Sequence, residues 1–214
     1  GKYDLHVTLF VFDFEALDHF VDMFNKTFPG LVKDFLVCYV LEHHLYSHKF
    51  FSTPPTVISY GYNDTFVTLD TLDKKILSTL KLNCRVSCLE LAKGTDVTYK
   101  TILNRIKILE QKKVILGYRM FISSQAYKPF ILLLSFKNYS HQEEKKLYVY
   151  LKEQTEVTQS LRLFGKWNVF IHLRTKDAES LQILLIHLRN QFALIDTFEI
   201  IPVFEDIAIN LYPC

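Results

Sequence analysis

The chain has 214 residues, of which 49% are hydrophobic and 22% are charged, and its formal net charge is +2. This length allows one or two domains with a buried core. No apolar run approaches the roughly 20 residues that a membrane-spanning helix needs, and no signal peptide is visible before the first strand-like pattern. We therefore expect a cytoplasmic globular protein that makes no contact with a membrane.

The residue types that often carry chemistry form no recognisable catalytic or metal-binding framework. Among the four cysteines, Cys84 and Cys88 are four residues apart, but no second pair of ligands accompanies them. The sequence also has no Gly-rich phosphate loop, nucleophile elbow or paired-carboxylate motif. These observations predict reduced thiols, no metal, no cofactor and no enzymatic activity.

The first 50 residues show a strand–helix–strand pattern. An alternating segment from Tyr3 to Val11 is followed by a helical stripe from Phe14 to Phe28 and a β-like stretch from Phe35 to His48. We expect the two strands to be neighbours, with the helix across one face. Residues 51–70 are rich in Pro and Gly turn signals and are typical of a linker.

Residues 71–119 contain three short helical patterns in succession. Asp73 is suited to cap the first helix, Ser87 the second, with Glu90 completing a capping box, and Thr98 the third. The residues expected to face the core of this unit are Ile76, Leu77, Leu80, Leu89, Leu91, Ala92, Ile102, Ile106 and Leu109. A Lys-rich turn and a β-branched run follow. This order is typical of a winged helix-turn-helix, which reads DNA.

Positive charge is concentrated on this helical unit. Between Leu72 and Tyr118, ten Lys or Arg less four Asp or Glu give +6, which leaves 2 − 6 = −4 for the rest of the chain. An ordinary solvated helix face is the plainer alternative, but it does not require such a local excess of charge. We predict that the DNA contacts, with Arg105 as the first choice, come from Arg85, Thr98, Tyr99, Lys100, Thr101, Asn104, Arg105 and Lys107.

Residues 120–214 predict a second complete domain. A strand from Phe130 to Phe136, an amphipathic helix over 141–154 and a strand from Leu161 to Phe164 precede a further strand, helix and strand. The order β-α-β-β-α-β is that of a ferredoxin-like fold. In the strand over 169–174 alternate residues would face the helices and the opposite side of the sheet.

The N-terminal pattern recurs in this second domain at an offset of 164 residues. Gly1-Lys2-Tyr3-Asp4 is similar to Gly165-Lys166-Trp167-Asn168, and the match continues through the next strand and six apolar helix positions. We interpret residues 1–50 as half of another ferredoxin-like module, which cannot bury both of its faces alone. The expected fold class is therefore α+β, with a winged helix-turn-helix between a partial and a complete module.

The helical unit resembles the DNA-binding domain of the Lrp/AsnC (feast/famine) family of transcription regulators. The matching segments are LDKKIL at 72–77, LELA at 89–92, TYKTILNRIKILE at 98–110 and VILGY at 114–118. The module order is similar to that of the family's second domain, the RAM module. Gly94 departs from the family, in which a larger residue is common, and this departure is expected to loosen the second helix.

The resemblance implies a sequence-specific transcription regulator that binds duplex DNA and pairs through RAM-type sheets. The pair would be a homodimer or a pseudo-dimer within one longer tandem chain, and for this chain we expect a second copy as the partner. In the family, small effectors bind at a Gly-x-x-Asp loop, so effector binding is implied for Gly165, Lys166, Trp167 and Asn168. The amide of Asn168 cannot pair with an ammonium charge, and the alternative is a tight turn over a packed Trp167.

Two other functions are compatible with the sequence. Siroheme decarboxylases resemble this architecture, but they carry His near the porphyrin in the segment after the wing, and residues 119–125 contain none. An RNA- or ribosome-associated adaptor is the other alternative, because a basic unit also suits RNA phosphates.

Overall fold

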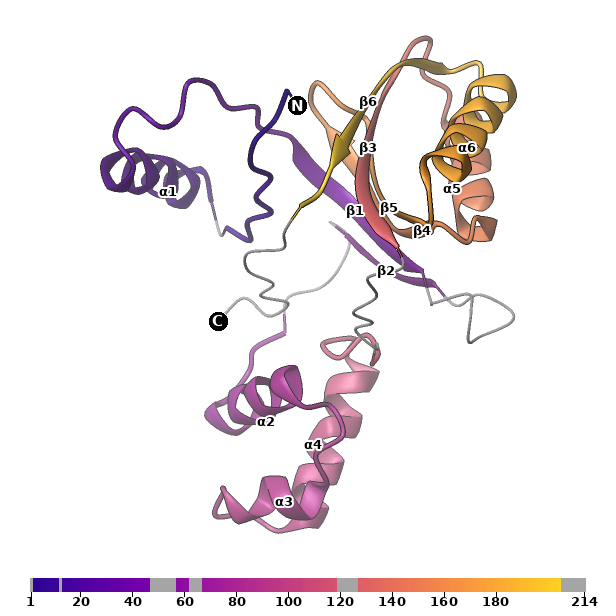
Figure 1. Cartoon of the computed structure of the whole chain (residues 1–214). Coiled ribbons are helices and arrows are strands. Elements are labelled where there is room, and N and C mark those ends of the chain that lie inside the picture. Colours follow the sequence, from indigo (N-terminus) through magenta and orange to yellow (C-terminus); the bar gives the residue numbers. More distant parts are fainter. Residues whose placement is uncertain (1, 12, 47–56, 62–66, 119–126, 205–214) are drawn as a thin grey trace.

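The computed structural model describes residues 2–11, 13–46, 57–61, 67–118 and 127–204. A six-stranded antiparallel sheet carries two helices on one side, while a three-helix unit and the helix α1 (Phe14–Thr27) stand apart from it (Figure 1). The strand order in the sheet is β2-β1-β4-β5-β3-β6. The chain therefore combines an antiparallel sheet with separate helical parts, as the predicted α+β class requires.

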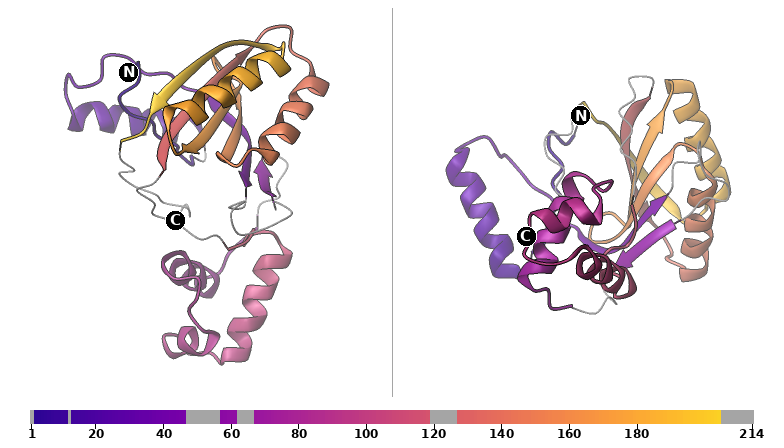
Figure 2. Two further views of the ribbon diagram at one scale, coloured as in Figure 1. Left: turned by 45° about the vertical axis from the view of Figure 1, so that its right-hand side comes forward. Right: turned by 90° about the horizontal axis from the view of Figure 1, so that it is seen from below.

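The C-terminal part of the sheet is a complete ferredoxin-like module. Its elements, in chain order, are β3 (Lys128–Phe136), α5 (His141–Glu153), β4 (Val157–Phe164), β5 (Val169–Thr175), α6 (Ala178–Gln191) and β6 (Ile195–Pro202). The predicted β-α-β-β-α-β order is confirmed. Both helices cover the same face of the sheet (Figure 2), because each crossover of this fold returns the chain on that side.

The two faces of the module bury different sets of residues. Val169, Ile171 and Leu173 of β5 pack toward α5 and α6 in the larger core. Phe170, between them, points to the other side. There it joins a second cluster, which we call the open-face cluster, formed by Ile131, Leu133, Leu161, Leu163, Trp167 and Phe170. The alternation predicted for this strand is confirmed.

The N-terminal part of the chain extends the same sheet. Strand β1 (Tyr39–Tyr46) pairs antiparallel with β4 on one side and with β2 (Val57–Gly61) on the other. Strand β2 lies inside the segment that we predicted to be a linker, so that prediction is wrong for residues 57–61. The run Val57-Ile58-Ser59-Tyr60 is β-branched and aromatic, and it pairs with β1 once that strand is fixed on the sheet.

The predicted strand at Tyr3–Val11 is absent, although the predicted helix that follows it is present as α1, capped by Asp13. The complete module explains the difference. Its corresponding strands, β5 and β6, are not neighbours, because β3 lies between them and pairs with both. The N-terminal pattern has no counterpart of β3 in the described part of the chain, and the prediction that its two strands are neighbours is wrong. Its first segment therefore has no adjacent strand with which to form a ladder, and α1 buries no residue.

A buried charge network ties β1 to the module. Arg162 of β4 donates through Nε to Glu144 of α5 at 3.0 Å and lies 3.8 Å from Glu42 of β1. Tyr139 donates to Glu144 and accepts from Arg162 at 3.0 Å. Glu144 is only 3% exposed, so its carboxylate depends on these partners. A buried charge without them would carry an uncompensated desolvation cost.

The substitution Arg162→Ala is expected to lower the free energy of unfolding by about 3 kcal/mol, because it leaves Glu144 buried without its cation. The matched control is Lys146→Ala, which removes an exposed ion pair with Glu143 on the same helix and should cost under about 0.5 kcal/mol. Urea unfolding followed by circular dichroism measures both. Equal effects of the two substitutions would contradict a structural role for the network.

Candidate nucleic-acid interface

The helical unit begins with a reciprocal cap on α2 (Thr71–Leu82). The side chain of Asp70 accepts a hydrogen bond from the Asp73 N–H at 2.8 Å, and the Asp73 side chain accepts from the Asp70 N–H at 3.3 Å. The N-cap is therefore Asp70, one turn before the predicted Asp73. In the sequence Asp-Thr-Leu-Asp either acid suits a cap, and the structure uses both in a capping box.

The other two helices begin where the sequence predicts. Ser87 caps α3 (Cys88–Lys93) by accepting from the Glu90 N–H, and Thr98 caps α4 (Tyr99–Gln111) by accepting from the Thr101 N–H. The buried core that the three helices share consists of Ile76, Leu77, Leu91, Ile102 and Leu109. The prediction that Leu89 is buried is wrong, since it is 61% exposed. It stands two residues before Leu91, which places it on the opposite side of a short helix.

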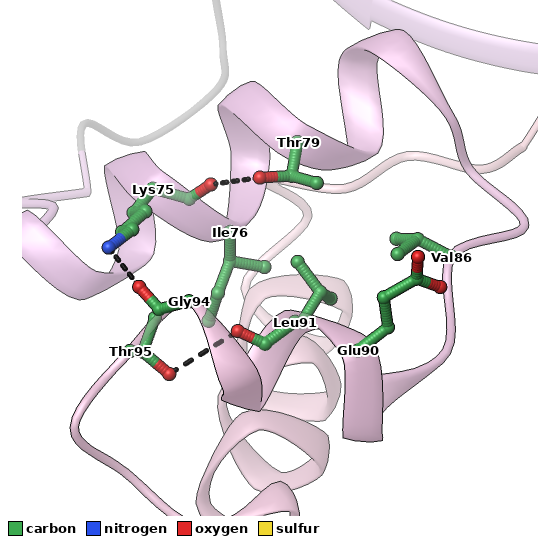
Figure 3. A pocket seen from close by; sticks show the side chains of 8 residues that line it. All are labelled: Lys75, Ile76, Thr79, Val86, Glu90, Leu91, Gly94 and Thr95. Atoms are coloured by element: carbon green, nitrogen blue, oxygen red, sulfur yellow. Dashed lines mark hydrogen bonds between the residues drawn. The ribbon is translucent and has the colours of Figure 1, made fainter.

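A hollow of about 230 Å³ lies between α2 and α3, where Gly94 ends the shorter helix (Figure 3). A Cβ at Gly94 would meet nothing closer than the Leu91 carbonyl at 3.9 Å. Lys75 spans the gap and donates to the Gly94 carbonyl. The departure from the family at this position therefore leaves space beside the short helix, and a lysine side chain bridges it.

Arg105 faces α2 rather than the outside of the unit. Its guanidinium lies 2.8 Å from the Asp70 carboxylate and 3.4 Å from that of Asp73. Our first choice for a phosphate or base contact is therefore already paired within the chain. The hydrogen bond from the Asp73 N–H lowers the pKa of Asp70, and the Arg105 charge lowers it further.

Four other predicted residues remain outward on α4. Lys100, Asn104 and Lys107 follow each other at i, i+4 and i+7 and are all exposed, so they form one stripe. We call these three residues the outer stripe. Tyr99 is also exposed at the helix start. The structure thus brings two cations and an amide together on one helix face, with an exposed phenol at the start of the helix.

The three remaining predicted contacts lie around the helix ends. Thr98 and Thr101 are within 3.1 Å of each other through their hydroxyl oxygens, at the cap of α4. Arg85 is exposed in the loop between α2 and α3, where its backbone N–H donates to Asn83 Oδ1 at 3.0 Å. The two threonines fix the start of the helix, while Arg85 provides a separate cation.

The exit from the helical unit is packed against the sheet. The backbone of Gly117 lies so close to Ile58 of β2 that a Cβ there would be 2.7 Å from Ile58 Cδ1. Tyr118 donates to Glu110 at 3.0 Å. Residues 119–126, which include the segment compared with siroheme decarboxylases, lie outside the described residues.

The loop predicted to bind an effector is occupied by contacts within the chain. Trp167 is 5% exposed, and Asn168 Oδ1 accepts a hydrogen bond from the Phe136 N–H at 2.8 Å. A Cβ on Gly165 would lie 3.0 Å from Cys38 Sγ. Only Lys166 extends from the loop as an exposed charged group, stacked over the Trp167 ring. The geometry matches the packed-turn alternative.

No group of metal-ligating residues and no helix long and apolar enough to cross a membrane occurs among the described residues. Cys38, Cys84 and Cys88 are free thiols.

The substitution Arg105→Ala is expected to lower the free energy of unfolding by about 1–2 kcal/mol, because Asp73 is buried and loses a charged hydrogen-bond partner. The Asp73 N–H and, to a smaller extent, the Arg105 charge lower the pKa of Asp70, so the contribution of the Arg105–Asp70 pair is present above the unfolded value of about 3.9 and is lost as the pH falls through the folded value. Urea unfolding at pH 7 and pH 3 measures it. Lys107→Ala is the control, and a matching loss of stability in that variant would refute this role.

Comparison with known proteins agrees with this geometry. A family model described as winged helix-turn-helix DNA-binding matches residues 69–115. Regulatory protein AsnC of Escherichia coli K12 is 31% identical over 125 residues, which cover 56% of this chain and 79% of AsnC. The HTH-type transcriptional regulator FL11 of Pyrococcus furiosus is 30% identical over 53% of this chain and 75% of its own. An uncharacterized HTH-type regulator of Pyrococcus abyssi is 48% identical, but over only 35% of its length.

Solved structures give the same result for the fold. The structure of E. coli AsnC has a TM-score of 0.59 and 25% identity, and the match covers 68% of this chain and 99% of AsnC. A transcriptional regulator from Neisseria meningitidis, solved as a complex with L-Met, has a TM-score of 0.61 and 18% identity over 67% of this chain and 95% of its own. With its capped helices, basic outer stripe and ferredoxin-like module, the chain belongs to the Lrp/AsnC family of DNA-binding transcription regulators.

Proposed function

We propose that this regulator recognises a specific duplex sequence by placing α4 in the major groove with the outer stripe toward the bases. This proposal rests on the arrangement of α4, in which Lys100, Asn104 and Lys107 share one exposed face. Arg105 lies on a different face, where it pairs with Asp70. In a helix-turn-helix, the residues near the N-terminus of the second helix contact base edges. Tyr99 and Asn104 are suited to that role, and the two lysines to phosphates.

Arg85, Thr98 and Thr101 complete the proposed interface without reading sequence. Arg85 is an exposed cation in the loop between α2 and α3, suited to a backbone phosphate. The threonines hold the first turn of α4, where free N–H groups favour an anion. Arg105 acts as a positioning residue, since its ion pairs with Asp70 and Asp73 fix the angle between α2 and α4.

The proposed function includes a paired assembly of the regulator and a location in the cytoplasm. Helix-turn-helix regulators commonly read two half-sites through a paired arrangement, so we propose that RAM-type sheets pair either between two chains or within one. The protein would act in the cytoplasm, on chromosomal DNA. The relatives named above are transcription regulators, so the proposal includes no enzymatic step.

The proposed function also includes regulation by a small effector. The N. meningitidis regulator is named as an L-Met complex, but the loop Gly165-Lys166-Trp167-Asn168 offers a cation for a carboxylate and no anion for an ammonium. Because Trp167 and Asn168 are already engaged within the chain, we propose that an effector at this loop contacts only the exposed Lys166 and is a small carboxylic acid.

Each of Lys100→Ala and Lys107→Ala is expected to weaken duplex binding and to reduce the slope of log K against log salt by about one unit. Asn104→Ala should reduce discrimination between a selected site and a single-base variant by about 1–3 kcal/mol. Fluorescence anisotropy with a selected duplex at two salt concentrations measures both. Lys145→Ala, an exposed lysine on α5, is the control.

Unchanged affinity in both lysine variants would remove α4 from the DNA interface. Tighter binding to structured RNA than to any duplex would instead favour the adaptor function. A porphyrin absorbance band in the purified protein would favour the haem-pathway alternative.

The effector proposal predicts that 2-keto acids raise the melting temperature while the matching amino acids do not. At 100 times the dissociation constant, a bound ligand stabilises the protein by about 2.7 kcal/mol. Differential scanning fluorimetry with L-Met and its 2-keto acid provides a matched pair, and Lys166→Ala should abolish the shift. Stabilisation by L-Met alone would contradict the proposal.

A further inference from the structure

The open face of the C-terminal module is already closed within one chain. In an open ferredoxin-like sheet the face without helices is exposed unless something covers it. Here Leu161 is 5% exposed and Phe170 4% exposed, and every member of the open-face cluster is buried in the isolated chain. The members of this cluster are therefore already buried and are not available to a second protein.

Residues of the N-terminal half-module provide the cover. The Trp167 Nε1–H donates to Tyr3 Oη at 3.2 Å, and the His6 ring stacks on Phe170 with 4.8 Å between ring centroids. Tyr3 and Cys38 pack against the open-face cluster. Lys2 lies 3.7 Å from Glu199, which shares a face with Leu133 on the neighbouring strand.

The residues in these contacts occupy equivalent positions of the internal repeat, which indicates that the contacts are symmetric. Tyr3 is the repeat equivalent of Trp167, and His6 is the equivalent of Phe170, each at the offset of 164 that relates the two modules. Lys2 and Lys166 repeat the pattern, since each stacks over its own aromatic neighbour. In an isologous pair a residue contacts its own equivalent only beside the two-fold axis. Two such contacts therefore mark a pseudo-two-fold axis between the half-module and the complete module.

We propose that the N-terminal half-module takes the place of a second subunit, so that the sheet pairing of this regulator occurs within one chain. The inference deepens the pairing in the proposed function by naming its partner, residues 2–46 of the same chain. Strand β1 adds to the same attachment, because it pairs with β4 along the edge of the module. Residues 2–204 then contain one paired sheet and one DNA-reading unit.

Cross-linking at the axis distinguishes pairing within a chain from pairing between chains. The parent is the 214-residue chain with all four cysteines replaced by Ser. In His6→Cys/Phe170→Cys, a short bismaleimide should join the two thiols within one chain, and the product should migrate as a monomer. Phe170→Cys alone should give no dimer, although in a homodimer paired through this face each introduced thiol would lie opposite its own copy. Lys26→Cys/Phe170→Cys is the control for non-specific reaction, because Lys26 is exposed on α1.

A second measurement avoids substitutions at the packed face. Carbodiimide treatment should couple Lys2 Nζ to the Glu199 carboxylate as an amide, with loss of water. In a mixture of ¹⁴N- and ¹⁵N-labelled chains the linked peptides should carry a single label. Dimers from Phe170→Cys alone, or mixed labels in the Lys2–Glu199 product, would overturn the proposal. DNA affinity is measured separately, so failure of duplex binding would leave the cross-linking result intact.

Discussion

The need to cover the second face of an open sheet is the constraint on which the rest of this structure depends. Helices α5 and α6 cover one face of the sheet. The open-face cluster lies on the other face and is apolar, so its exposure to water would be unfavourable. Tyr3, His6 and Cys38 supply part of the cover, and β1, which directly follows Cys38, pairs with the edge strand β4. Strand β2 pairs with the other side of β1, so the coverage and the hairpin belong to one continuous segment of sheet.

The same constraint accounts for the state of the half-module. A split β-α-β unit places another strand between its own two strands, as β3 lies between β5 and β6. The described residues contain no such strand for the N-terminal segment, so Tyr3–Val11 forms no ladder, and no residue of the apolar stripe of α1 is fully buried. Its repeat equivalent, α6, buries Leu181, Leu184 and Leu188. Similar patterning thus has opposite outcomes, because burial depends on a partner as well as on periodicity.

How well the sequence predicts a feature depends on how far apart in the chain the interacting residues lie. The caps at Ser87 and Thr98 depend on N–H groups three residues away, and both predictions are confirmed. The ion pair of Arg105 joins residues more than 30 positions apart, and nothing local marks it. Strand β2 escapes prediction because the Pro and Gly signals around it outweigh its own β-branched residues. The contact between Tyr3 and Trp167 is one that the repeat could in principle predict. When two copies of a repeat pair with each other, equivalent residues meet at the two-fold axis.

The connection between the DNA-reading unit and the sheet follows from these same contacts. Gly117, at the exit of the helical unit, lies against the side chain of Ile58 of β2, which would have to move to admit a Cβ at this position. Strand β2 is held by β1, and β1 is held on β4 by backbone pairing and by the network around Glu144. Among the described residues, the exit of the helical unit therefore contacts the N-terminal hairpin at Ile58. A change that loosens β1 would reach this exit through β2, whereas a change confined to the outer stripe would leave the sheet unaffected.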